Sequence, residues 1–207
     1  MAAAYGQGPE PRPRRADARL NRERLVATAQ EVFAESGPEA SLNEIARRAG
    51  VGPGTLYRHF PNRPALLSAV LRERIAALCA RAEELSTTEP PDVALRAWLH
   101  AFLVHARVNQ GLAGAHLVDK QGGRETGGAD DGLVDCHRLI LDTASRLLTR
   151  AQEDGTVRGD LTADDLVHLV VGIALSTTQS RDAGQPGRLL SLVLDATHAS
   201  AAPANDR

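Results

Sequence analysis

Apolar residues recur every three or four positions along most of this 207-residue chain, a spacing that places them on one face of a helix. Gly, Pro, Ser, Thr and Asp stand between these periodic segments, as residues that begin or end helices. The pattern predicts about nine helices, over roughly residues 19–36, 42–49, 53–60, 62–86, 92–108, 111–118, 131–154, 163–175 and 187–199. We therefore expect an all-α fold.

Residues 41–63, SLNEIARRAGVGPGTLYRHFPNR, predict two short helices joined by a tight turn. Ser41 and Glu44 have the spacing of a capping box at the start of the first helix. Gly50 supplies the left-handed residue that ends it. The second helix ends before Pro61, because a residue that precedes proline is pushed out of helical geometry. Two short helices around a glycine-containing turn are typical of a helix-turn-helix, whose second helix enters the DNA major groove.

The stretch GVGPGTLYRHFPNRPALL, with the helix before it and the earlier segment RERLVATAQEVFAESG, resembles the TetR family of transcriptional regulators. The resemblance is strong over residues 19–72, and beyond them only the general helical plan agrees. It implies an N-terminal three-helix DNA-binding domain and a C-terminal helical domain for ligand binding and dimerisation. It also implies a repressor that binds a palindromic DNA operator as a homodimer and is released by a small-molecule effector.

The resemblance also implies roles for single residues of the second short helix. Family positions that touch the DNA backbone correspond to Thr55, Tyr57 and His59, and Arg63 takes the place of a phosphate-binding lysine. The variable, base-reading positions hold Pro53, Gly54 and Arg58, and Asn43 adds a contact from the helix before. Since proline and glycine offer only van der Waals contact, Arg58 is expected to carry most direct readout, to guanine O6 and N7. The predicted DNA contacts are Asn43, Pro53, Gly54, Thr55, Tyr57, Arg58, His59 and Arg63.

Composition and charge set the domain organisation. Residues 1–18 are rich in Gly, Pro, Ala and Arg and are expected to form a disordered basic arm. A helix-turn-helix domain over 19–62, a ligand-binding and dimerisation domain over 63–200, and a disordered tail over 201–207 follow. Residues 1–60 hold nine arginines against seven acids, a net charge of +2, whereas the remaining 15 basic and 19 acidic residues give −4. A basic end on an acidic body suits attraction to DNA phosphates.

The last two predicted helices are apolar on nearly every face, and a helix apolar all round must be covered all round. One chain of this size can cover one side of such a pair. A second copy is therefore expected to cover the other side, in a four-helix bundle between two protomers. The predicted dimer contacts are Leu166, Leu169, Val170, Ile173, Leu189, Leu190 and Val193.

For the effector, the resemblance implies a cavity among the predicted helices over 92–108, 111–118 and 131–154. Its predicted lining is Trp98, Phe102, His105, His116 and His137. The sequence does not identify the effector. The segment 121–132 holds five glycines and is therefore expected to be a mobile loop. It lacks the strand, the Lys-Ser/Thr ending and the helix of a phosphate-binding loop, so we do not interpret it as one.

Several function classes lack support in the sequence. The chain has no nucleophile elbow, Cys-x-x-Cys pair, His-Glu-x-x-His helix or dinucleotide fingerprint, so we expect neither an enzyme nor a cofactor. His100 and His105 are five residues apart, a spacing that does not let them chelate one metal ion. Two cysteines make no disulfide framework, and no signal peptide or membrane-spanning run is visible, so a cytoplasmic protein is expected. Two alternatives stay open: a metal-sensing regulator, and a helical interaction protein that does not bind DNA.

Overall fold

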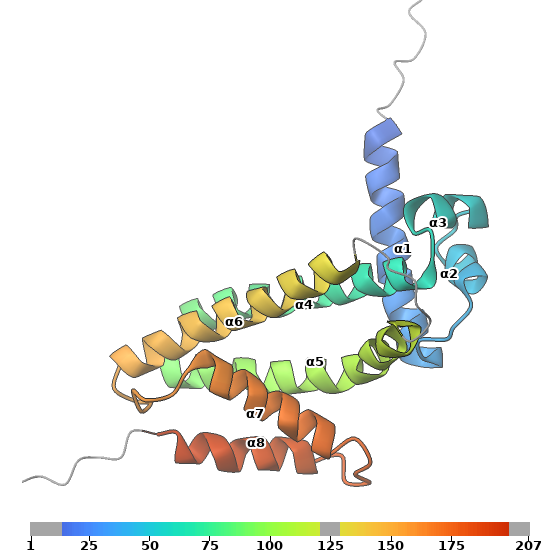
Figure 1. The fold of residues 1–207 in the computed structure, drawn as a ribbon. Coiled ribbons are helices and arrows are strands. Elements are labelled where there is room, and N and C mark those ends of the chain that lie inside the picture. Colours follow the sequence, from blue (N-terminus) through green and yellow to red (C-terminus); the bar gives the residue numbers. More distant parts are fainter. Residues whose placement is uncertain (1–13, 121–128, 199–207) are drawn as a thin grey trace, which may run out of the picture. The chain divides into compact units, whose positions relative to one another are not determined.

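The computed structural model describes residues 14–120 and 129–198, with side chains over 16–108 and 136–198. The described backbone is almost entirely helical (Figure 1) and confirms the all-α fold. Its eight helices are α1 (Arg14–Ser36), α2 (Leu42–Arg48), α3 (Pro53–His59), α4 (Arg63–Thr88), α5 (Pro91–Lys120), α6 (Ala129–Glu153), α7 (Ala163–Ser176) and α8 (Gln185–Ala196). The predicted tail over 201–207 lies outside the described residues.

The chain divides into two compact units, Met1–Leu66 and Leu67–Arg207. In the first unit, α1, α2 and α3 pack around a small core. The predicted apolar stripe of α1 is buried, with Leu25, Val26, Ala29, Val32 and Phe33 all nearly inaccessible to solvent. Facing residues from α2, α3 and the position after α3 complete this core: Ile45, Ala46, Leu56 and Phe60.

The turn between α2 and α3 has the predicted geometry. Gly50 adopts φ +69°, and the amides of Gly50 and Val51 donate to the carbonyls of Arg47 and Ala46, at 3.1 and 3.0 Å. These two bonds form the glycine-ended helix cap that Gly50 predicts. Pro53 stands in the first turn of α3, where its missing amide costs nothing.

One local prediction in this unit is wrong. The side chain of Ser41 makes no capping hydrogen bond, and Glu44 does not reach back to the start of α2. The Glu44 carboxylate instead accepts hydrogen bonds from Arg47 and Arg48, at 2.7 to 2.9 Å. Bonds between two charged groups are stronger than a bond from a neutral amide, so the arginines one turn ahead take the carboxylate.

The second unit is built from α4 to α8, and α5 packs against α6, α7 and α8. Trp98 is fully buried at its centre, where the indole Nε1 donates to the Leu78 carbonyl at 3.0 Å. Thr162 and Asp165 form a capping box at the start of α7. Beside the C-terminus of α8, a backbone bridge joins Val157 to His198 and ties the end of that helix to the loop after α6.

Helix α5 differs from its prediction. A break was expected after residue 108, with a separate helix over 111–118, but α5 is continuous from Pro91 to Lys120. The described residues therefore form eight helices where nine were expected. A glycine inside a helix costs only about 1 kcal/mol relative to alanine and keeps its amide, so Gly111 does not interrupt the hydrogen bonds. The helix also begins one residue earlier than predicted, at Pro91, so Asp92 lies in its first turn.

Helix α1 also begins earlier than predicted, at Arg14, so residues 14–18 of the predicted disordered arm are helical. Alanine and arginine favour helices, and the last proline before the packed part of α1, Pro13, stands just ahead of the first turn. Residues 1–13 of the predicted arm lie outside the described residues. Helix α6 likewise begins at Ala129, inside the predicted loop over 121–132. The first eight residues of that loop, 121–128, lie outside the described residues.

Candidate nucleic-acid interface

Helix α3 presents a short polar face. Leu56 and the following Phe60 are buried and hold the helix against the core of the first unit. Four predicted contacts are exposed: Pro53, Gly54, Tyr57 and Arg58. Two more, Thr55 and His59, are half-buried at its edges, and Asn43 is exposed on α2. The fold therefore leaves all three predicted base-reading positions, Pro53, Gly54 and Arg58, exposed on α3.

The start of α3, at Pro53 and Gly54, has no protruding polar side chain, whereas Arg58 near its end is charged. A Cβ added to Gly54 would meet no atom within 4 Å, so nothing in the first unit fills the space above it. No described residue forms a hydrogen bond or ion pair with the Arg58 guanidinium. Its donors are therefore available to a partner outside the chain. An arginine at this position can donate two parallel hydrogen bonds to the edge of guanine.

The arginines of α2 are bound within the chain. Arg48 donates to Glu44 and, at 2.7 Å, to Glu35 of α1, while Arg47 donates to Glu44. Hydrogen bonds from Arg47 and then Arg48 lower the pKa of Glu44 to about 2. The carboxylate thus stays charged near neutral pH and, together with that of Glu35, offsets the charge of both arginines. Positive charge available to DNA on this unit lies on α3 and α1 more than on α2.

Arg63 has partners that its predicted phosphate role does not include. The half-buried Arg63 is the first residue of α4, and its Nη1 donates to the carbonyls of Pro38 and Ala40, at 2.6 and 2.7 Å. Both carbonyls belong to the turn between α1 and α2. Arg63 therefore fastens the start of α4 to that turn, inside the first unit.

Two arginines of α1, Arg22 and Arg24, stabilise the same unit by contacts within the chain. The Arg22 guanidinium lies 5.4 Å from the centre of the Phe60 ring. Arg24 Nη2 donates to the Ala49 carbonyl at 2.9 Å, at the end of α2. Their partners lie 25 or more residues away in the chain, so no spacing rule identifies them. The only signal in the sequence is the excess of arginine near the N-terminus.

The predicted effector residues are only partly gathered. Trp98 and Phe102 stack with ring centres 5.6 Å apart, and Phe102 and His105 are 6.4 Å apart. Burial, and then the charge of Arg74, lower the pKa of His105 to about 4, so its imidazole is neutral near pH 7. His137 is exposed on α6, and the His116 side chain lies outside the described residues. The structure thus aligns three of the five predicted residues on α5.

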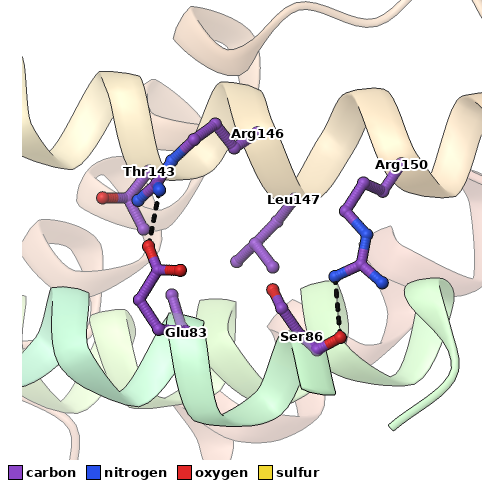
Figure 2. A pocket seen from close by; sticks show the side chains of 7 residues that line it. Glu83, Ser86, Thr143, Arg146, Leu147 and Arg150 are labelled. Atoms are coloured by element: carbon purple, nitrogen blue, oxygen red, sulfur yellow. Dashed lines mark hydrogen bonds and ion pairs between the residues drawn. The ribbon is translucent and has the colours of Figure 1, made fainter.

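A shallow cavity of about 160 Å³ lies between α4 and α6, away from these residues (Figure 2). Glu83 and Arg146 form an ion pair across one end, and Arg150 donates to the Ser86 carbonyl at 2.9 Å across the other. Its lining is Ala82, Glu83, Ser86, Thr143, Arg146, Leu147 and Arg150. None of the predicted effector residues lines this cavity.

Within the described part of the chain, no three His, Cys, Asp or Glu side chains are placed to hold a metal ion.

The predicted dimer residues are buried or half-buried within a single protomer. Four are buried against neighbouring helices of the same protomer: Leu166, Val170, Ile173 and Leu190. The other three are half-buried: Leu169, Leu189 and Val193. The exposed apolar side chains of these two helices are different residues: Val171, Leu175 and Leu192, at 37%, 59% and 67% exposure.

Among the described helices, none is long and apolar enough to span a bilayer.

Comparison with known proteins agrees with this architecture over most of the chain. Residues 25–70 match the family described as bacterial regulatory proteins of the tetR family, and residues 90–197 match the C-terminal domain of SbtR-like transcriptional regulators. The fold is similar to that of a TetR transcriptional regulator from Streptomyces coelicolor, with a TM-score of 0.72 and 37% identity, covering 87% of this chain and 99% of that one.

A second solved structure, a TetR transcription regulatory protein from Mycobacterium vanbaalenii, is 32% identical with a TM-score of 0.67, covering 90% of this chain and 99% of that one. Among curated proteins, the uncharacterized HTH-type regulator TtgW of Pseudomonas putida is 45% identical over 60 residues, 28% of this chain. The chain spans less than half the length of the curated relatives it matches. From the two family matches and the full-length structural similarity, the chain belongs to the TetR family of bacterial transcriptional regulators.

Proposed function

We propose that this regulator is a homodimeric repressor that binds a palindromic operator and is released by a small-molecule effector. Regulators of this family bind DNA, typically as dimers. The observation that carries the proposal is the exposed face of α3. It combines two positions without a protruding polar side chain, Pro53 and Gly54, with the available guanidinium of Arg58. Such a face fits against base edges closely and discriminates through one long side chain.

In this proposal the residues of α3 and its neighbours have different roles in DNA binding and folding. Arg58 reads guanine, and a good bidentate contact of this kind discriminates by about 1–3 kcal/mol against the wrong base. Tyr57, Thr55, His59 and Asn43 position the helix by contacts to the sugar-phosphate backbone, which carry no sequence information themselves. Arg63 is assigned to folding of the first unit, because its Nη1 is engaged by two carbonyls.

The dimer surface in this proposal differs from the one predicted from sequence. Residues that one protomer already buries are not available to a second protomer, so the contact surface is assigned to the exposed side chains Val171, Leu175 and Leu192. These lie on α7 and α8, and a second copy packing the same two helices would give a four-helix interface. Two recognition helices could then reach half-sites about 34–36 Å apart.

Effector control is proposed to act through α4. Its residues Arg63–Leu66 belong to the first unit and the rest to the second, so it is the helix that continues from one unit into the other. A ligand bound beside the aromatic side chains of α5 would change the position of α4 and so weaken DNA binding. Such couplings are typically about 1–3 kcal/mol and reciprocal. A Bacillus subtilis regulator of similar fold was crystallised with stearoyl-CoA, at only 18% identity.

The test begins with the wild-type protein and a random duplex library, from which bound DNA is selected and sequenced. We expect enrichment of a palindrome with guanine in each half-site. Fluorescence anisotropy then compares Arg58→Ala with wild type on the selected and on random duplexes. The variant should bind the selected duplex about 5–150-fold more weakly and random DNA almost normally.

Arg81→Ala serves as the matched control, since it removes the same charge from an exposed position of α4. Equal loss by Arg58→Ala on both kinds of duplex would mean that Arg58 contacts only phosphate. Failure of the wild-type protein to enrich any sequence would overturn the proposed function as a whole.

A further inference from the structure

The cavity between α4 and α6 combines buried, largely apolar residues with a charged rim. Three of its lining residues are each only 2% exposed: Ala82, Thr143 and Leu147. The Thr143 hydroxyl donates to Cys79 Sγ at 3.3 Å, so it is engaged within the chain. The other four lining residues are exposed or half-buried: Glu83, Ser86, Arg146 and Arg150. Two arginines against one acid give this lining a net positive charge.

Arg150 is held in place by the end of α4. Inside a helix, the amide that serves the Ser86 carbonyl belongs to residue 90, but Pro90 has no N–H. Arg150 Nη1 donates to this carbonyl instead, at 2.9 Å. The guanidinium has five N–H donors, so this bond leaves Nε and Nη2, which form a planar fork. Such a fork matches the two oxygens of a carboxylate.

The remaining charges on the rim favour an anion. Glu83 forms an ion pair with Arg146, and the two side chains are 63% and 59% exposed. Solvent screens such a pair, which typically strengthens an association by no more than about fivefold. Figure 2 shows the side chains of Arg146 and Arg150 extending from α6 towards α4 on either side of Leu147. Glu83 is therefore the weakly held acid against which an incoming anion competes.

We propose that this cavity binds a small organic carboxylate. Its carboxylate accepts hydrogen bonds from Nε and Nη2 of Arg150, and its apolar body lies against Ala82 and Leu147. A cavity of about 150 Å³ can hold benzene, so the volume of about 160 Å³ limits the body to about one six-membered ring. The site is separate from the effector position proposed beside α5, because none of those residues lines it.

The experiment titrates the 207-residue protein with benzoate in a calorimeter and requires no DNA. Three further probes separate the parts of the proposal: benzamide has the ring without the charge, acetate has the charge without the ring, and 2-naphthoate has a second ring. Benzoate should bind with a Kd of about 1 mM, and each other probe about tenfold more weakly or not at all. In NMR spectra, the methyl signals of Leu147 should shift with benzoate and locate the site.

Variants of the rim should change benzoate binding in opposite directions. Arg150→Gln should weaken it about tenfold, and Arg150→Lys, which keeps the charge without the fork, should recover only part of the loss. Glu83→Gln should strengthen it by up to about fivefold, because the competing carboxylate is gone. Ser86→Leu places a larger side chain in the cavity and should exclude benzoate while both arginines remain. Arg81→Gln removes an equal charge from an exposed position of α4 outside the lining and should behave like wild type.

Several results would overturn the inference. Benzamide binding as tightly as benzoate would exclude recognition of the charge, and acetate binding as tightly would exclude the apolar body. Unchanged affinity in Arg150→Gln, or Leu147 methyl signals that do not move, would place benzoate elsewhere. None of these results affects the selection of an operator by the wild-type protein, so the proposed function is tested separately. Far-UV circular dichroism verifies that each variant is folded.

Discussion

Arg63→Ala separates two roles for the first residue of α4. The substitution removes the hydrogen bonds that Nη1 donates to the carbonyls of Pro38 and Ala40, at 2.6 and 2.7 Å. Hydrogen bonds that involve a charged group contribute about 1.5–3 kcal/mol each. Arg63 is only half-buried, so water can replace part of the loss, and both bonds share one nitrogen. We therefore expect the free energy of unfolding of the first unit to fall by about 2 kcal/mol in total.

The assay joins stability with DNA binding. Hydrogen exchange should show faster exchange of amides near Pro38 and Ala40, because the turn that Arg63 holds opens more often. The salt slope of DNA binding should stay at the wild-type value, since the lost donors served carbonyls and not phosphates. Arg63→Lys, which keeps the charge but loses the planar fork, should recover only part of the protection.

The opposite pair of results would refute this reasoning. Unchanged exchange together with a salt slope lower by about 0.9 per protomer would make Arg63 a phosphate contact, as the family resemblance implies. Restoration of that slope by Arg63→Lys would strengthen the refutation, because phosphate accepts a lysine readily.

Two further predictions concern assembly and acid stability. Leu175→Arg should give a folded monomer in sedimentation at about micromolar concentration, because an unpaired charge in an apolar interface costs several kcal/mol. The control Ala76→Arg, on an exposed site of α4, should remain a dimer. A monomeric wild-type protein would contradict the proposed interface. Burial, and then the charge of Arg74, lower the folded pKa of His105 to about 4. The folded state should therefore lose stability as pH falls from about 6.5 towards 4, because the unfolded imidazole gains a proton that the folded one does not. Urea midpoints at pH 7 and 5 should therefore differ more for wild type than for His105→Phe, and equal differences would assign the acid sensitivity elsewhere.

Signals within a few residues of one another determined much of the first unit. The left-handed Gly50, the pre-proline stop at Phe60 and the buried stripe of α1 each depend on local backbone conformation or helical spacing. Such features are readable because their physical causes lie within one or two turns of the chain. The helix-turn-helix and the exposed face of α3 follow from them.

Tertiary structure decided what the arginines do. The partners of Arg63 lie 23 and 25 residues away, that of Arg24 lies 25 residues away, and the Phe60 ring beside Arg22 is still more remote in the chain. A long flexible cationic side chain can serve carbonyls, aromatic rings, acids or phosphates, and helical spacing does not distinguish among them. Only the packing of α1 beside α2 and α3 selects which of these comes within reach.

The same limit explains the dimer surface. Apolar residues surround α7, so its sequence predicts that the helix is covered without specifying which side faces its own protomer. Packing against α5, α6 and α8 buries Leu166, Val170 and Ile173 and leaves Val171 and Leu175 outside. Hydrophobic burial is non-directional, so the periodicity determined that these residues avoid water, and the arrangement of the neighbouring helices decided which of them a second protomer can still reach.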